Sequence, residues 1–447
     1  MWTQGKKTGF KIQDSGFGHR RLPSCTVFRI PYSISIILLT VSFLLNTVSV
    51  FAGDLNLQTL IDEALKNNPE IRASEARASA SRYKIPQAES LPDPMFMFGY
   101  QNEGLKKYNY GKSSDAQWMF SASQMFPFPG KLSLKGEMTS KDAESLTASH
   151  NSVKLKIIAR IKELYYDLFF AHKNIELIKE RASLFSRVED AAIARYQSGK
   201  GSQQEVLMAQ TEKYMLIEKE EMLKQKIQSI EAMLNTAAGR DVNSLLGKPE
   251  TPIPVVYNRN MNELLKISLE NSPEIKVREK MVASAEVRVK IAEKEYYPDF
   301  TLAASLFERR GDFEDMWSLT TTINIPLFYR TKQKQAVYEA VSSLSEARNE
   351  LQSIKLMISS AARDNYSMLK TAERLMELYK NGLIPRTYQD VELALAGFIT
   401  GKVEALTVIT KLKSLIDLEI LYWGQFMERE KAMARLEAIT GIKVSEK

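Results

Sequence analysis

Few residues of this chain have the type and spacing that chemistry requires. Gly199-Lys200-Gly201-Ser202 has the composition of a phosphate-binding loop, but Ala194 stands where the first glycine of that motif belongs. His150 and His172 are far apart and have no accompanying carboxylate pattern, so they do not make a zinc motif. The sequence also has no motif that pairs a nucleophile with a base. We therefore predict no catalytic residue, no cofactor and no metal site, and we do not expect an enzyme.

Sulfur-containing side chains offer two further possibilities. The only cysteine, Cys25, precedes an apolar segment, whereas a lipid-attachment cysteine must follow one, so we expect no lipidation, disulfide or thiol catalysis. Four methionines share one face of the strands predicted below: Met95, Met97, Met119 and Met316. They could line a path for a soft metal ion, but simple filling of a barrel wall is the preferred explanation.

The composition is that of a folded protein that carries an export signal. Of the 447 residues, 26% are charged and 44% are hydrophobic. The net charge of +7 comes mostly from the N-terminal segment, so nucleic acid is not an expected partner. That basic segment precedes an apolar run at 33–50 and the small residues Ala52 and Gly53, which predicts a signal peptide at 1–52. An uncleaved anchor is the alternative, since about 18 apolar residues can just span a bilayer.

The rest of the chain contains one pattern twice. Residues 57–71 and 261–275 match, and both contain Pro-Glu at the start of a predicted helix. Five later landmarks recur in the same order: Pro92-Asp93 with Pro298-Asp299, Trp118 with Trp317, Pro127 with Pro326, the turn at 196–200 with that at 398–402, and 234–239 with 436–441. We predict two structural repeats, 53–238 and 261–441, joined by a proline-containing linker at 239–260 and followed by a tail at 442–447.

Each repeat is expected to contain short helices (the second of them over 69–90 in the first repeat), two strands, a very long helix and a final helix. The strands are predicted at about 94–103, 115–128, 299–308 and 315–328, the long helices at about 131–197 and 330–397, and the final helices at about 202–238 and 403–440. The first long helix would extend for roughly 100 Å. Pro385 should kink or interrupt the second. Coiled-coil hairpins alone would explain the helices but not the strands between them.

The strands alternate between an apolar face and a small, polar face. The aromatic residues of the apolar face are Phe96, Phe98, Trp118, Phe120 and Trp317. This alternation is typical of strands with lipid on one side and water on the other, although a soluble sheet alternates in the same way. Four strands cannot close a barrel, which needs about eight, and open edges in lipid would leave backbone groups unsatisfied. Several copies are therefore expected to share one β-barrel.

With these features the chain resembles the TolC-type outer-membrane efflux proteins over residues 55–441. The resemblance rests on the duplication and on five segments: Asn68-Pro69-Glu70, Ser272-Pro273-Glu274, 126–131, 382–385 and 401–404. It implies an α+β membrane protein, a homotrimer whose copies each give four strands to a twelve-stranded barrel in the outer membrane and long helices to a periplasmic α-barrel. It implies a passive duct of a tripartite efflux system, with a periplasmic adaptor protein and an inner-membrane pump of the RND type as partners. A soluble periplasmic coiled-coil scaffold is the alternative, and the cargo cannot be named.

The resemblance also implies where functional positions lie. The periplasmic tip and the adaptor contact fall at Gly199, Lys200, Gly401 and Lys402. Glu205 and Glu404 stand where acidic residues often ring an aperture, and Thr410 stands where many relatives carry aspartate. Acids in a first turn that favour the helix dipole are a simpler interpretation of both glutamates. The chain would cross from membrane to periplasm at Pro127, Pro129, Gly130 and Pro326, and the two crossings should bend differently because the second lacks a counterpart of Pro129 and Gly130.

Overall fold

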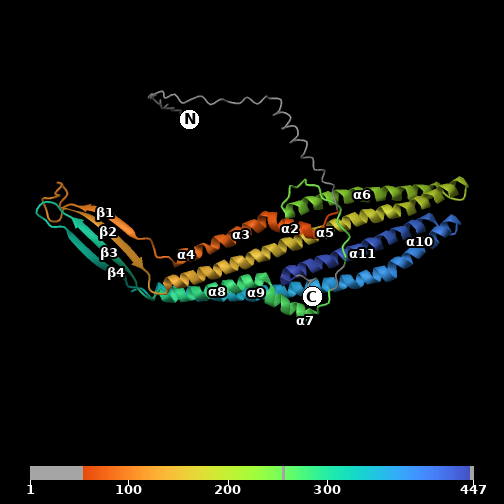
Figure 1. Cartoon of the computed structure of the whole chain (residues 1–447). Coiled ribbons are helices and arrows are strands. Elements are labelled where there is room, and N and C mark those ends of the chain that lie inside the picture. Colours follow the sequence, from red (N-terminus) through yellow and green to blue (C-terminus); the bar gives the residue numbers. More distant parts are fainter. Residues whose placement is uncertain (1–53, 254–256, 443–447) are drawn as a thin grey trace, which may run out of the picture. The chain divides into compact units, whose positions relative to one another are not determined.

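The computed structural model describes residues 54–253 and 257–442, so the predicted signal peptide and the tail after 442 lie outside the described residues. Two similar series of elements follow each other along the chain (Figure 1). The first series is α2 (Leu57–Asn67), α3 (Pro69–Arg82), α4 (Lys84–Glu89), β1 (Met95–Gln101), β2 (Gln117–Phe126), α5 (Lys131–Gln197) and α6 (Gln203–Ala238). The second is α7 (Met261–Asn271), α8 (Pro273–Lys294), β3 (Asp299–Glu308), β4 (Met316–Asn324), α9 (Gln333–Leu378), η1 (Tyr379–Leu383), α10 (Ile384–Ile399) and α11 (Ala405–Thr440).

The four strands form one antiparallel sheet in the order β1-β2-β3-β4. Phe98 lies opposite Phe120, Phe120 opposite Leu306, and Leu306 opposite Trp317. Residues directly opposite each other point to the same face of a sheet, so the apolar residues of all four strands gather on one face. β1 and β4 are the edge strands.

The helices of the two repeats pack on one another. The long helix α5 contacts α3, α4 and α6 of the first repeat and α8 and α11 of the second. At the end of α5 away from the sheet, one buried apolar cluster joins Phe185 of α5, Ala209 of α6, Phe398 of α10 and Leu412 of α11. The hairpins α5–α6 and α10–α11 therefore share one core. Among the described helices, none combines the length and apolar character needed to cross a membrane.

The second long helix is interrupted near Pro385, as its sequence predicts. A π-helical turn, η1, separates α9 from α10, and Pro385 lies in the first turn of α10. Proline lacks the amide N–H, and its ring crowds the preceding turn, so a regular α-helical ladder cannot pass through it.

The prediction of a single helix over 69–90 is wrong, because the chain forms two helices, α3 and α4, with Tyr83 between them. Pro86 explains the break, since it cannot donate the hydrogen bond that would join it to Arg82.

Both final helices end at a glycine whose φ lies in the left-handed region: 77° at Gly239 and 72° at Gly441. Gly239 also touches backbone, because a Cβ there would lie 2.7 Å from the carbonyl carbon and oxygen of Asn67. Gly239→Ala should lower the free energy of unfolding by about 2 kcal/mol or more, through strain and backbone overlap together. Gly441→Ala is the matched control at about 1 kcal/mol, because its nearest neighbour, the Asn271 oxygen, is 3.2 Å away. Chemical denaturation in detergent, monitored by circular dichroism, measures the free energy of unfolding of both variants. Equal losses in the two variants would contradict the prediction.

Candidate functional site

Two helix-to-helix turns hold the residues expected to contact an adaptor. The first follows α5 and the second follows α10. Gly199 and Gly401 have φ angles of 71° and 78°, which glycine adopts without strain. Lys200 and Lys402 follow these glycines and are exposed. Each repeat therefore presents one exposed lysine at its turn.

Arg195, in the last turn of α5, connects the two turns. Its Nη1 donates a hydrogen bond to the carbonyl oxygen of Phe398 (2.9 Å), and its Nη2 donates one to the carbonyl oxygen of Lys200 (3.2 Å). Its guanidinium carbon lies 5.0 Å from the centre of the Phe398 ring, and its Nε lies 3.8 Å from Oε2 of Glu205. The sequence analysis missed Arg195. The available signal was a basic residue at a helix C-terminus, where free carbonyl groups need donors.

The three candidate aperture residues have different surroundings. Glu205 lies in the first turn of α6 beside Arg195 and is partly buried. Glu404 is the exposed N-cap residue of α11. Thr410 is exposed farther along α11, and its hydroxyl donates a hydrogen bond to the carbonyl oxygen of Leu406 (2.8 Å). Glu404 and Thr410 are thus on the surface, whereas Glu205 is partly buried and faces Arg195 of the same chain without a hydrogen bond between Oε2 and Nε.

A buried lysine holds the first crossing, residues 127–130. Lys131 begins α5 and is 2% exposed. Its Nζ lies 2.9 Å from Oδ1 of Asp299 and 3.3 Å from Oε2 of Glu295, and it donates a hydrogen bond to the carbonyl oxygen of Tyr297 (3.1 Å). Asp299 also accepts a hydrogen bond from the backbone N–H of Phe128 (2.7 Å). The first crossing, which contains Pro127, Pro129 and Gly130, is thereby fixed to the second repeat.

The second crossing, residues 325–332, is longer and more open. It begins around Pro326 and passes through a turn before α9 starts. Ile325, Leu327 and Phe328 are exposed there. The two segments thus differ in length and exposure, and a difference in bend stays a prediction. Where the first has Pro129 and Gly130, with φ of 90° at the glycine, to direct the chain into α5, the second uses additional residues.

Lys131→Ala should lower the free energy of unfolding by about 3 kcal/mol, because Asp299, which is largely buried, would lose its cation. Lys135→Ala, one turn later on α5 and exposed, is the matched control and should change it by about 0.5 kcal/mol or less. Thermal unfolding in detergent compares the two variants. Similar losses in both would show that Lys131 acts only as a helical residue.

The aromatic residues predicted to face lipid share one face of the sheet. Phe96 is 81% exposed and Trp317 is 79% exposed, and Phe98 and Phe120 are also exposed. Phe98 stacks on Trp118 with ring centres 5.1 Å apart. The opposite face carries the four methionines, of which Met119 and Met316 both lie opposite Phe307 in neighbouring strands.

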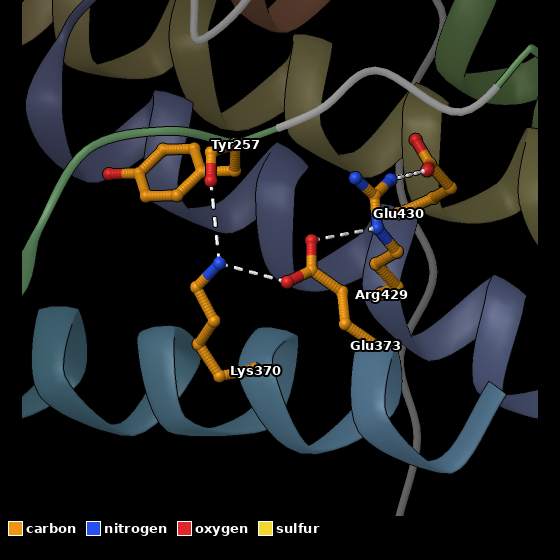
Figure 2. A network of polar contacts seen from close by, with 5 residues as sticks. All are labelled: Tyr257, Lys370, Glu373, Arg429 and Glu430. Atoms are coloured by element: carbon orange, nitrogen blue, oxygen red, sulfur yellow. Dashed lines mark hydrogen bonds and ion pairs between the residues drawn. The ribbon is translucent and has the colours of Figure 1, made fainter. Parts of the chain in front are cut away.

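A partly buried polar network lies between α9, α11 and the linker (Figure 2). Arg429 and Glu430 are neighbours on α11, are 4% and 5% exposed, and are joined by a hydrogen bond. Glu373 accepts hydrogen bonds from Nε of Arg429 (3.3 Å) and from Nζ of Lys370 (2.9 Å), and Lys370 reaches the carbonyl oxygen of Tyr257 (3.3 Å). Burial raises the pKa of Glu430, and Arg429 opposes that rise. The network fastens α9 and the linker to α11.

The residues that could do chemistry remain dispersed. His150 lies 2.7 Å from the hydroxyl of Ser74, and burial lowers the pKa of both His150 and His172. Within residues 54–253 and 257–442, no group of three or more His, Cys, Asp and Glu side chains is placed to hold a metal ion.

Comparisons with known proteins agree with this architecture. A family model described as outer membrane efflux protein matches residues 60–240 and 264–416. The chain is 22% identical to the cobalt-zinc-cadmium resistance protein CzcC of Cupriavidus metallidurans, over 87% of this chain and 91% of CzcC. It is 20% identical to the cation efflux system protein CusC of Escherichia coli, over 75% of this chain and 79% of CusC. The structure of the outer membrane protein VceC from Vibrio cholerae superposes with a TM-score of 0.73 at 17% identity, covering 86% of this chain and 96% of VceC. The chain therefore belongs to the outer membrane efflux protein family, the TolC-type family that its sequence resembles, and it is an outer-membrane channel of an efflux system.

Proposed function

We propose that three copies of this chain assemble into one passive duct, with β4 of each copy beside β1 of the next. The exposed aromatic face of the sheet carries this proposal. Phe96, Phe98, Phe120 and Trp317 would contact lipid, while the serine- and threonine-rich face would contact water. Open strand edges in lipid would cost several kcal/mol for each unpaired backbone group, so the edges of β1 and β4 need a partner. In a soluble periplasmic scaffold this apolar face would be exposed to water with nothing to cover it.

The turns at the end of the shared helical core are proposed as the contact for a periplasmic adaptor that links the duct to an inner-membrane pump of the RND type. Lys200 and Lys402 are exposed there, one from each repeat, and Gly199 and Gly401 shape their turns. Glu404 and Thr410, both exposed on or before α11, are proposed to border the aperture.

For the cargo we propose divalent metal cations. The names of CzcC and CusC support this class, since they refer to cobalt-zinc-cadmium resistance and to cation efflux. A strain of the source cell that lacks this chain should become sensitive to cobalt, zinc or cadmium, and the cloned chain should restore growth. Unchanged metal tolerance together with new sensitivity to an organic solvent would replace metal by solvent as the cargo.

The duct itself is tested with the full chain purified from outer membranes in detergent. We expect three copies per particle by native mass measurement and ion conductance in a planar bilayer. A water-soluble, non-conducting product would contradict the proposal and favour the scaffold. Trimers that bind lipid but do not conduct ions would support the proposed assembly and contradict only its role as an open duct.

A further inference from the structure

The sequence motif that receives Lys131 occurs in both repeats. Before β3 the chain reads Ile291-x-x-x-Glu295-x-x-Pro298-Asp299, and before β1 it reads Ile85-x-x-x-Glu89-x-x-Pro92-Asp93. Glu295 and Asp299 bind Lys131. Glu89 and Asp93, at the matching positions, are exposed, and within the described residues neither makes an ion pair.

The cation is repeated as well. Leu168 of α5 corresponds to Leu369 of α9, and both are fully buried; Ala171 and Ala372 correspond at the same spacing and are also buried. Counting back along α5 and α9 at this spacing places Lys332, the N-cap residue immediately before α9, at the position of Lys131, the first residue of α5. Lys332 immediately precedes α9 and is exposed, and its ammonium makes no ion pair with any described residue.

The order of elements explains why these groups do not meet within one copy. The helices next to the sheet contact one another in the row α4–α5–α8–α9, and the strands follow the order β1-β2-β3-β4 (Figure 1). Lys131, at the start of α5, pairs with Asp299 at the start of β3, and both elements lie in the middle of their rows. Lys332 precedes α9, at one end of the row, whereas Glu89 and Asp93 lie at the other end, beside β1. Only a second copy can bring the two ends together.

We propose that Lys332 of each copy forms an ion pair with Asp93 and Glu89 of the next copy, as the intermolecular equivalent of the Lys131 contact. This inference rests on the proposed assembly of copies through β4 and β1. Each interface between two copies would then contain one lysine and two carboxylates, next to the ends of the strands from which the helices start. In a single copy the second crossing is exposed. The proposed ion pair would fix it to the next copy, just as the ion pair of Lys131 with Asp299 fixes the first crossing to the second repeat.

The repetition of these charges is selective. Two other ion pairs join α5 to α8: Lys156 with Glu274, and Glu144 with Lys280, each at 2.5 Å. At the same spacing, α9 carries Met357 in place of Lys156 and Ser345 in place of Glu144. On α9 each of these pairs has lost its charged residue, although Glu70, the counterpart of Glu274, is kept, whereas the Lys131 site has kept both acids and the lysine. A general similarity between the repeats does not explain that difference.

Cross-linking between copies tests the proposal. All variants carry Cys25→Ser, and the test variant adds Asp93→Cys and Lys332→Cys. Outer-membrane fragments that contain the full chain are treated with a short bis-maleimide and analysed by denaturing electrophoresis. We expect covalent dimers and trimers from the double variant and only monomers from either single variant. The matched control, Lys131→Cys with Asp299→Cys, should consume both thiols yet give only monomers, because its two positions lie in one copy.

A charge exchange provides a second measurement. Lys332→Asp should lower the temperature at which trimers dissociate on native electrophoresis, and adding Asp93→Lys should restore part of the loss. Conducting trimers that give no covalent dimers, or a double exchange no better than the single one, would overturn the ion pair and leave the duct intact. The absence of trimers in the unmodified chain would overturn both proposals.

Discussion

Arg429→Ala is expected to lower the free energy of unfolding by about 3 to 5 kcal/mol, because it leaves Glu430 buried without its cation. The carboxylate of Glu373 loses a hydrogen bond in the same change (Figure 2). The measurement is chemical denaturation in detergent, followed by circular dichroism. The matched control is Arg435→Ala on the same helix. Arg435 is more exposed and pairs with Glu163 at 2.6 Å, so its loss should cost about 1 kcal/mol or less.

A double variant separates the loss of the cation from the loss of packing. Glu430→Gln removes the buried charge and keeps the shape of the side chain. If Arg429→Ala is costly mainly because it strands the charge of Glu430, it should cost less in the Glu430→Gln background than in the natural chain. Equal costs in both backgrounds would show that Arg429 stabilises the fold through its other contacts.

The cost of Arg429→Ala should also depend on pH. Burial raises the pKa of Glu430 and Arg429 opposes that rise, so removing Arg429 raises the pKa further. A raised pKa means that the folded chain holds the proton more tightly than the unfolded chain. The resulting stability is present at low pH and is lost as pH rises through the folded pKa. The variant should therefore lose less stability at about pH 5 than at about pH 8, and the Glu430→Gln background should remove that difference.

The fold was largely predictable because its signals are local and occur twice. Long helical periodicity, alternating strands and glycine turns can each be read from a short window, and the duplication places them in order. The α3–α4 break was missed although Pro86 is a local signal for it. The interruption at Pro385 was predicted, but its form as a π-helical turn was not.

The candidate site was only partly predictable. The tip turns follow from Gly199 and Gly401, since glycine at a helix end is a strong local signal. The place of Arg195 at a helix C-terminus is a local signal for a contact with carbonyl groups, but its partner Phe398 is 203 residues away in sequence and belongs to the other repeat, so the link between the two turns could not be predicted. The same holds for Lys131 and its acids around Asp299. These lysine and arginine residues become informative only when packing has brought the two repeats together.

Arg195→Ala is expected to loosen both tip turns at once. It removes hydrogen bonds to the carbonyl oxygens of Phe398 and Lys200, and it leaves Glu205 beside an apolar side chain. A loss of about 2 kcal/mol in local stability corresponds to about 30-fold faster amide hydrogen exchange in the two turns. Mass spectrometry of peptides that cover 195–205 and 397–405 measures this exchange, with the sheet peptides as an internal reference.

Arg187→Ala is the matched control, because Arg187 also lies on α5 and faces an acid of α10. Its Nη1 is 3.7 Å from Oε1 of Glu392, and its side chain is 53% exposed, so its removal should cost about 0.5 kcal/mol or less. Faster exchange in the first turn alone would mean that Arg195 stabilises only its own hairpin. Faster exchange in both turns would show that one side chain holds the tips of the two repeats as a single surface. An adaptor that contacts Lys200 and Lys402 together requires such a surface, so its affinity should fall for Arg195→Ala and not for Arg187→Ala.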